Sequence, residues 1–312
     1  MSPAVKRKKE FEGARDPITL SVIYNRLLTI NQEMGITMIN TSISPIFAEV
    51  HDFSCAICDW NDRIVAQIDG VPSHTASAME AVKAISREFA GDIHPGDVFV
   101  LNDPYLGGTH LPDVTIMKPI FSEGALQFVA INRAHHGDVG GIEPGSYAPG
   151  ATELFHEGIR IPPLRIYKNE KPIMDVVNMI RINTRMPDAL WVDMKAQVAS
   201  CRVAERRILE LIEKYGVKKV RETVEDIHSY AENRMRKEIE ALADGVYEGE
   251  SFLDSDGFSD DPIRIKVKIT VKGDEAFVDF DGSGPQVTGF VNSPIANTAT
   301  CVYVAFLTTV TT

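Results

Sequence analysis

A long stretch of helical periodicity limits the folds open to this sequence more than any other feature. Between Pro187 and Leu242 the pattern is helical almost throughout, with a break at Gly216. The apolar positions of its first part form one stripe: Leu190, Met194, Val198, Cys201, Ile208, Leu211 and Ile212. A stripe of this kind is typical of a helix face buried in a core or against a partner. The rest of the chain is therefore expected to cover it.

The remaining segments predict sheets and further helices. Asp16 is suited to cap a helix that begins at Pro17 and runs to about Thr37. Short apolar or alternating runs predict strands at 53–58, 64–68, 98–101, 114–117, 126–132, 263–271 and 276–280, and helical spacing predicts a helix at 73–89. This order predicts an α+β fold with mixed sheets and a long helical segment.

The same pattern divides the chain into four parts. Residues 1–13, with the basic run 6–9, are expected to be a disordered tail, and residues 14–186 an α+β domain. Residues 187–244 form the helical segment, and residues 245–312 the start of a second, β-rich region. The sequence stops directly after the apolar run 301–307, so we expect this last region to be truncated.

Charge and hydropathy exclude several classes of function. The chain has 44 acidic and 32 basic residues, for a net charge of -12, which argues against nucleic-acid binding because phosphates would be repelled. No stretch approaches the roughly 20 apolar residues of a membrane helix, and the amino terminus lacks the apolar core of a secretion signal. We therefore expect a cytoplasmic protein without a membrane or nucleic-acid partner.

The four cysteines are too few and too scattered for a disulfide framework. Cys55 and Cys58 have the spacing of a zinc or redox pair, but they lie on a predicted strand, where residues three apart face opposite sides. No second pair lies nearby in the sequence. We therefore expect both to be buried thiols, and Cys201 to be a packed thiol on the helical stripe.

Histidine and aspartate residues cluster at the ends of three predicted strands. Three of the eight histidines fall in the 27-residue window from His110 to His136, in the segments His110-Leu-Pro-Asp113 and His135-His136-Gly-Asp138. Two His and one carboxylate suit Mn, Zn, Fe or Co and leave positions open for water or substrate. Adjacent residues of an extended chain point oppositely, so only one of His135 and His136 is expected to ligate. The alternative is that these histidines simply cap loops or bond backbone groups.

The neighbouring loops supply further candidates for catalysis. Gly107-Gly108 and Gly140-Gly141 allow the backbone to come close to a ligand, and the long stretch 137–163 has the composition of a functional loop. Glu153 and Glu157 could be acid-base groups, metal partners or surface ion pairs. His74 could contact substrate or cap the helix that it precedes.

Nucleotide-binding motifs are absent from the sequence. It has no Gly-x4-Gly-Lys-Ser/Thr loop and no Gly-x-Gly-x2-Gly after a predicted strand. A Gly-x-Ser-x-Gly elbow is also missing. Any nucleotide used by this protein is therefore expected to bind to a partner.

Several segments, taken together and in order, resemble the hydantoinase B/oxoprolinase family, which includes one of the two subunits of N-methylhydantoinase and subunits of acetone and acetophenone carboxylases. The matching segments are Ala14-Arg15-Asp16-Pro17, Asp52-Phe53-Ser54-Cys55-Ala56, Asn102-Asp103-Pro104-Tyr105, Gly108-Thr109-His110-Leu111-Pro112-Asp113, Arg133-Ala134-His135-His136-Gly137-Asp138-Val139-Gly140-Gly141 and Glu157-Gly158-Ile159-Arg160-Ile161-Pro162-Pro163. Family members continue well past residue 312, so the chain resembles the amino-terminal part of a larger fold.

The resemblance implies a metal-dependent enzyme that works with an ATPase partner. Carried over from the family, the metal ligands are His110, Asp113 and His135. We take His136, Asp138 and Glu157 as the candidates for catalytic groups. The resemblance implies a hetero-oligomer in which ATP is bound by a separate hydantoinase A-like subunit, while the hydantoinase B-like part completes the reaction at a divalent metal.

Three functions remain open from the sequence. The first is hydrolysis of a cyclic amide such as a hydantoin or 5-oxoproline, with the metal polarising a carbonyl or activating water. The second is ATP-dependent carboxylation of a ketone at the same metal centre. The third is a scaffold fragment whose helical stripe docks a partner without catalysis.

Overall fold

The computed structural model describes residues 16–67 and 70–310, so the expected tail with its basic run lies outside the described residues. Its centre is a seven-stranded sheet with the strand order β2-β1-β5-β4-β3-β6-β7. All neighbouring strands of this sheet pair antiparallel. The strands are β1 (Phe53–Asp59), β2 (Ile64–Gln67), β3 (Val98–Leu101), β4 (Asp113–Ser122), β5 (Ala125–His135), β6 (Leu164–Lys168) and β7 (Lys171–Pro172).

Helices account for most of the remaining described chain. They are α2 (Pro17–Thr41), α3 (Pro45–Ala48), α4 (Pro72–Glu88), the 3-10 helix η1 (Pro104–Leu106), α5 (Leu154–Glu157), α6 (Met174–Ile182), α7 (Pro187–Tyr215), α8 (Val217–Glu240) and α9 (Ile295–Val310). The Asp16 carboxylate accepts a hydrogen bond from Thr19 N at 3.1 Å, as expected of a cap. Helix α2 continues past the predicted end to Thr41, because no residue there breaks it.

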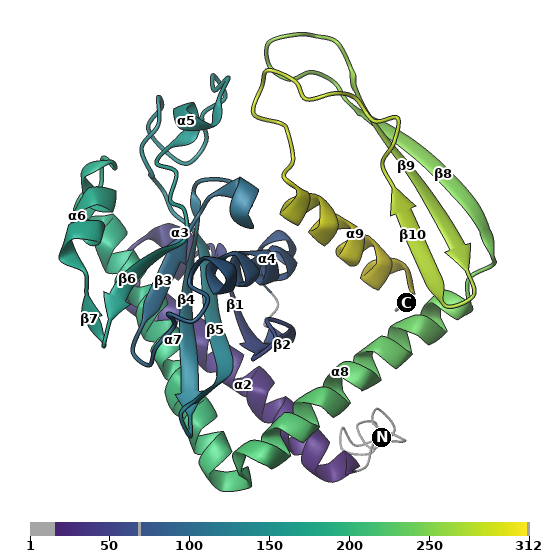
Figure 1. The fold of residues 1–312 in the computed structure, drawn as a ribbon. Coiled ribbons are helices and arrows are strands. Elements are labelled where there is room, and N and C mark those ends of the chain that lie inside the picture. The colour runs from purple at the N-terminus through teal and green to yellow at the C-terminus, as the bar shows by residue number, and fades with distance from the viewer. Residues whose placement is uncertain (1–15, 68–69, 311–312) are drawn as a thin grey trace.

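The two faces of the large sheet have different covers. Helices α2 and α7 pack on one face and α4 packs on the other (Figure 1). The predicted stripe of α7 is buried at every position from Leu190 to Ile212, which confirms that it belongs to the core. Among the described helices, none combines the length and the apolar character needed to cross a membrane.

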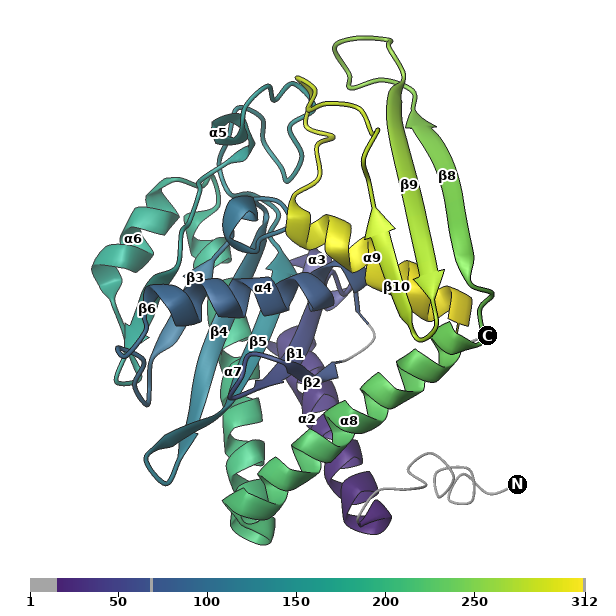
Figure 2. The same ribbon diagram turned by 45° about the vertical axis from the view of Figure 1, so that its right-hand side comes forward.

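A smaller sheet follows the long helices. It has the order β10-β9-β8, with β8 (Gly245–Leu253), β9 (Ile263–Lys272) and β10 (Glu275–Asp279), and α8 leads to it from the base of the molecule (Figures 1 and 2). Helix α9 then returns to pack against α4. The sequence pattern did not predict β8 or α9. For α9 the reason is that the apolar run 301–307 has no clear period. The region expected to be β-rich thus ends in a helix.

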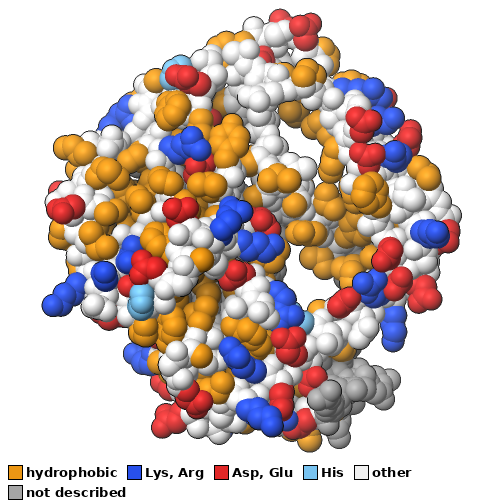
Figure 3. Space-filling view, in the orientation of Figure 1, with side chains coloured by type: hydrophobic (Ala, Val, Ile, Leu, Met, Phe, Trp, Pro, Cys, Tyr) orange, Lys and Arg blue, Asp and Glu red, His pale blue; other side chains and the backbone are white. Residues whose placement is uncertain are grey.

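Hydrophobic side chains remain exposed in this last region. Figure 3 shows them around an opening between the three-stranded sheet and the rest of the molecule. Exposed examples are Val246, Tyr247, Phe252, Phe277, Tyr303 and Leu307. The sheet and α9 therefore carry more apolar surface than the described chain covers.

The cysteine pair of β1 shows the alternation that the sequence predicts. Cys55 belongs to the core cluster on the α2 and α7 side, and Cys58 to the cluster on the α4 side. Both are buried free thiols, as is Cys201, whereas Cys301 on α9 is exposed. Burial raises the pKa of Cys55 to about 12 and that of Cys58 well above its usual range. The pair cannot converge on one metal ion.

Thiol labelling tests this arrangement. In native protein a maleimide reagent is expected to modify Cys301 readily and the three buried cysteines at least about a hundredfold more slowly, since they react only after local opening. Peptide mass spectrometry gives the site of labelling, and unfolded protein is the control in which all four react. Rapid native labelling of Cys55 or Cys58 would contradict the arrangement.

Candidate metal centre

Strand pairing brings His110, Asp113 and His135 together, and we call these three residues the triad. Strands β4 and β5 are antiparallel neighbours in which Asp113 and His135 are directly opposed. The first residue of β4 therefore lies beside the last residue of β5. A turn in which Asp113 N donates to His110 O at 3.0 Å brings the His110 side chain to the same place.

The donor atoms of the triad form a nearly equilateral triangle. His110 Nε2 lies 2.9 Å from Asp113 Oδ1, His135 Nδ1 lies 3.0 Å from the same oxygen, and the two nitrogens are 3.0 Å apart. Hydrogen bonds alone fit this triangle poorly, because one proton cannot serve two partners and two protons would face each other. A cation bound by all three atoms resolves the conflict. Octahedral ligands at about 2.1 Å from a metal are about 3.0 Å apart, which matches the triangle.

The carboxylate of the triad is held in its charged form. Burial opposes ionisation of Asp113, but hydrogen bonds with His110, His135 and His74 outweigh it and hold the pKa of this carboxyl well below its usual range. Burial likewise opposes protonation of His110, and Asp113 outweighs it and raises the pKa of this imidazole. A buried carboxylate is thus kept charged at the centre of the site, where it attracts a positive ion.

A second layer of side chains holds Asp113 in place. His74 Nε2, on the first turn of α4, lies 3.1 Å from Asp113 Oδ2, and the Thr109 hydroxyl donates to the same oxygen. Among the described residues, the buried His74 Nδ1 has no hydrogen-bond partner. Sequence reasoning offered His74 as a helix cap or a substrate contact. In the structure it contacts the Asp113 carboxylate and lines the cavity beside the triad. Such contacts fix the direction of the free lone pairs.

A buried arginine fastens the loop that carries this layer. The Arg133 guanidinium donates to Gly107 O and to Thr115 Oγ1, each at 2.7 Å, and also bonds Ser77 of α4. Gly107 has a φ of 97°, and a Cβ there would collide with the backbone of Ala81. Only glycine allows the loop to lie this close to α4. The glycine pair noted in the sequence thus serves packing beneath the triad.

His136 lies on the other side of the strand end from His135. Its Nε2 is 3.0 Å from Gln197 Oε1 on α7, and its ring packs edge-on against Phe47. Burial lowers the pKa of His136 to about 4, so the ring is neutral. It lines neither of the two cavities that adjoin the triad. We therefore treat His136 as a positioning residue rather than the catalytic group expected from the sequence, because adjacent residues of a strand point oppositely.

Asp138 anchors the loop that follows β5. Its carboxylate accepts hydrogen bonds from Gly140 N, Thr184 Oγ1 and Arg185 Nη1 at 2.9 to 3.0 Å. Burial opposes its ionisation, but these bonds outweigh it and lower the pKa of Asp138. Since its oxygens are engaged in this network, Asp138 is also better described as a positioning residue.

Two adjoining cavities border the triad. One, of about 310 Å³, is lined by the triad, Asp52, His74 and Tyr147 on one side and by residues 291–294 and 297 on the other. The second, of about 210 Å³, is lined by Glu157 of α5, by Pro104 and Tyr105 of η1, and by residues 286–290 and 292–294. His110 and Thr109 belong to both. Burial raises the pKa of Glu157, which gives this carboxyl a greater tendency to hold a proton.

Sequence reasoning did not single out Asp52 or Tyr147 as site residues. Asp52 precedes β1, and its carbonyl accepts His135 N at 3.1 Å, which places its carboxylate at the triad cavity. The Tyr147 ring lies 5.7 Å from His110 and 5.6 Å from His135, between ring centroids. Asp52 stands in a segment of the family resemblance, which was a usable signal. Tyr147 lies in an aperiodic loop that gave none.

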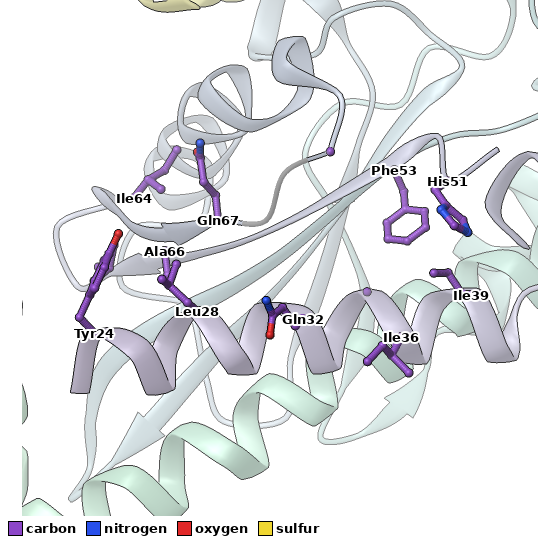
Figure 4. Close-up of a pocket in the computed structure, with 13 residues that line it drawn as sticks. Tyr24, Leu28, Gln32, Ile36, Ile39, His51, Phe53, Ile64, Ala66 and Gln67 are labelled. Carbon is purple, nitrogen blue, oxygen red and sulfur yellow. The ribbon is translucent and has the colours of Figure 1, made fainter. Parts of the chain in front are cut away.

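A larger cavity lies elsewhere, between α2 and β2. It has a volume of about 900 Å³, and Figure 4 shows Leu28, Gln32 and Ile36 of α2 on one side of it. Most of its lining is apolar or carries an amide. His51 is the one histidine among the described residues that line it. Among the described residues, the one group of three or more potential ligands that could hold a metal is the triad.

Comparison with known proteins shows the family of this chain. The model of the family described as hydantoinase B/oxoprolinase matches residues 16–312. The chain belongs to the hydantoinase B/oxoprolinase family. It is 35% identical over 292 residues to the beta subunit of caprolactamase from Pseudomonas jessenii, covering 94% of this chain and 50% of that protein. It is 33% identical over 297 residues to the B subunit of a putative D-/L-hydantoinase from Pseudomonas sp. strain NS671, covering 91% of this chain and 50% of that protein.

Solved structures of this family share the fold. The crystal structure of ATP-dependent caprolactamase from Pseudomonas jessenii aligns with a TM-score of 0.88 at 33% identity, over 95% of this chain and 51% of that one. A nucleotide-free structure of acetone carboxylase aligns with a TM-score of 0.87 at 20% identity, over 95% of this chain and 41% of that one. The chain thus spans about half the length of the relatives that it matches.

Substitution of the triad tests its role in this family member. Asp113→Asn and His110→Ala are each expected to lower metal affinity by well over about a hundredfold, because second-layer changes alone cost up to that much. Metal content after dialysis, measured by mass spectrometry, gives the result. His94→Ala is the matched control, since His94 is exposed and pairs with Asp92 away from the triad. Unchanged metal content in His110→Ala would remove the triad as the binding site.

The second layer has a separate, weaker effect. His74→Ala is expected to weaken metal binding by about ten- to a hundredfold without abolishing it, because Asp113 then loses an orienting hydrogen bond but keeps its place. Competition with a chelator gives the affinity, and thermal unfolding checks that the fold survives. A loss as complete as that of His110→Ala would instead make His74 a direct ligand.

Proposed function

We propose that this chain is the metal-bearing part of the hydantoinase B-like component of an ATP-dependent enzyme that hydrolyses a cyclic amide. The observation that carries the proposal is the triad, which places two imidazoles and one carboxylate on one side of an open cavity. Such a set leaves other positions of a metal free. A scaffold would have no use for ionisable groups assembled in this way.

The triad would hold a divalent ion. Two imidazoles and one carboxylate suit Mn, Fe or Zn. Asp52 borders the same cavity and could add a further carboxylate. When bound, a divalent metal polarises a carbonyl and makes water a better nucleophile.

Glu157 is the best placed group for proton transfer. It lines the cavity that shares His110 with the triad, and burial raises the pKa of its carboxyl. A carboxylate there can accept a proton from the attacking water and then give it to the ring nitrogen that leaves. Between these two transfers, Glu157 holds the proton on one of its carboxyl oxygens.

ATP would act through another subunit. The sequence has no phosphate-binding glycine loop, and two relatives are named as single subunits, beta and B, of their enzymes. The related caprolactamase is described as ATP-dependent. A separate ATPase-like subunit, hydantoinase A-like in kind, is therefore part of the proposal.

The reaction can be tested with the full-length protein and its ATPase-like partner subunit. The expected result is ATP-dependent ring opening of a hydantoin, 5-oxoproline or a lactam. Chromatography of the product measures it. Bicarbonate-dependent ATP turnover with a ketone would show the carboxylase reaction instead, in keeping with the shared fold of acetone carboxylase. Turnover of neither class would favour the scaffold.

The role of Glu157 gives a pH-dependent prediction. The free enzyme needs Glu157 ionised, so kcat/KM is expected to fall as the pH drops through the pKa of Glu157. Because this pKa is raised, the fall is expected at a higher pH than for an ordinary glutamate. Glu157→Gln should lower kcat by about 10²- to 10⁴-fold and remove this limb. Glu153→Gln is the control, because Glu153 lines the same cavity but pairs with His156. Wild-type kcat in Glu157→Gln would exclude the role.

A further inference from the structure

A segment far from the triad in sequence borders the site. Residues 286–294 follow β10 and lead into α9, and they line the smaller cavity opposite α5 and η1. Residues 292–294 also border the triad cavity. Figure 2 shows this segment beside the loops around α5. We call residues 286–294 the outer wall.

The outer wall has a fixed shape. Asn292 Oδ1 accepts Val287 N at 2.9 Å, and its Nδ2 donates to the carbonyls of Val287 and Gly289, each at 2.8 Å. The buried Asp256 carboxylate accepts Gly289 N at 3.1 Å, and a Cβ on Gly289 would overlap the Asp256 backbone. These contacts satisfy the backbone internally and pre-organise the loop, as binding surfaces require.

Apolar side chains of the outer wall are left facing the cavity. Phe290 and Val287 line it, and Phe290 remains 38% exposed. Leu154 of α5 and Tyr105 of η1 line the opposite side of the same cavity. Thr109 and His110 belong to both cavities, so a ligand here has its polar end next to the triad and its apolar body against the wall.

We propose that the outer wall determines which substrates enter, with Phe290 and Val287 limiting the size of the ring or alkyl chain that sits beside the reacting carbonyl. The ligand class is a small amide with a compact apolar body. The cavity of about 210 Å³ is below the usual range for drug-sized ligands, which supports a small ring. This inference rests on the proposed function and deepens it.

The test compares two lactams, one of smaller and one of larger ring, with the full-length enzyme, its ATPase partner and ATP. Phe290→Ala enlarges the cavity, so the ratio of kcat/KM for the larger over the smaller lactam is expected to rise about tenfold or more. Phe290→Trp should lower the same ratio. Metal content should stay that of the wild type, because Phe290 does not line the triad cavity.

Controls separate this inference from the proposed function. Phe258→Ala is the matched control, because Phe258 is exposed, follows Asp256 and lines neither cavity. An unchanged ratio of kcat/KM in Phe290→Ala would contradict the proposed role of the outer wall, while the proposed function would stand. If wild-type enzyme opens neither lactam, calorimetric binding of both lactams to wild type and Phe290→Ala tests the outer wall instead, and the proposed function fails only if a hydantoin and 5-oxoproline are also left intact. If wild type and Phe290→Ala show the same ratio of affinities for the two lactams, or if neither protein binds them, the proposed role of the outer wall is wrong.

Discussion

The register between β4 and β5 is the constraint on which the candidate site depends. Asp113 and His135 face each other because the antiparallel ladder runs without a shift from Ile120 and Phe128 to this pair. A shift by one residue would turn the His135 side chain to the opposite face and present His136 instead. The hydrophobic faces of the two strands resist such a shift, since each is buried under helices. Core packing therefore sets the geometry of the triad.

Buried polar groups beneath the triad are costly unless they are paired, and here they pair with one another. Asp113 contacts His74 and Thr109, while Arg133 bonds Gly107 and Thr115 close by. Burial lowers the pKa of Arg133 to about 10, and the nearby Asp113 charge opposes this effect. In the low-dielectric interior such paired polar groups strengthen one another. It ties α4, η1 and two strands into one rigid support for the ligands.

The cleft itself joins two regions that are distant in the chain. The large sheet supplies the triad and α5 supplies Glu157, whereas the outer wall comes from the segment between β10 and α9. Packing of α9 on α4 brings that segment over the site. The small sheet and α9 thus flank the segment that borders the triad cavity.

Local spacing in the sequence determined the long helices α2, α4, α7 and α8, most strands, the buried stripe of α7 and the opposed thiols of Cys55 and Cys58, because side-chain periodicity records which face is buried. It did not predict α3, α5, α6 or α9. It also placed the histidine and aspartate segments at strand ends, and the family resemblance named His110, Asp113 and His135. Only the tertiary structure decided that His136 and Asp138 face packing partners, and that Asp52, Tyr147 and the outer wall meet the triad. These contacts join residues far apart in the chain. Their proximity follows from sheet register and helix packing, which no local pattern encodes.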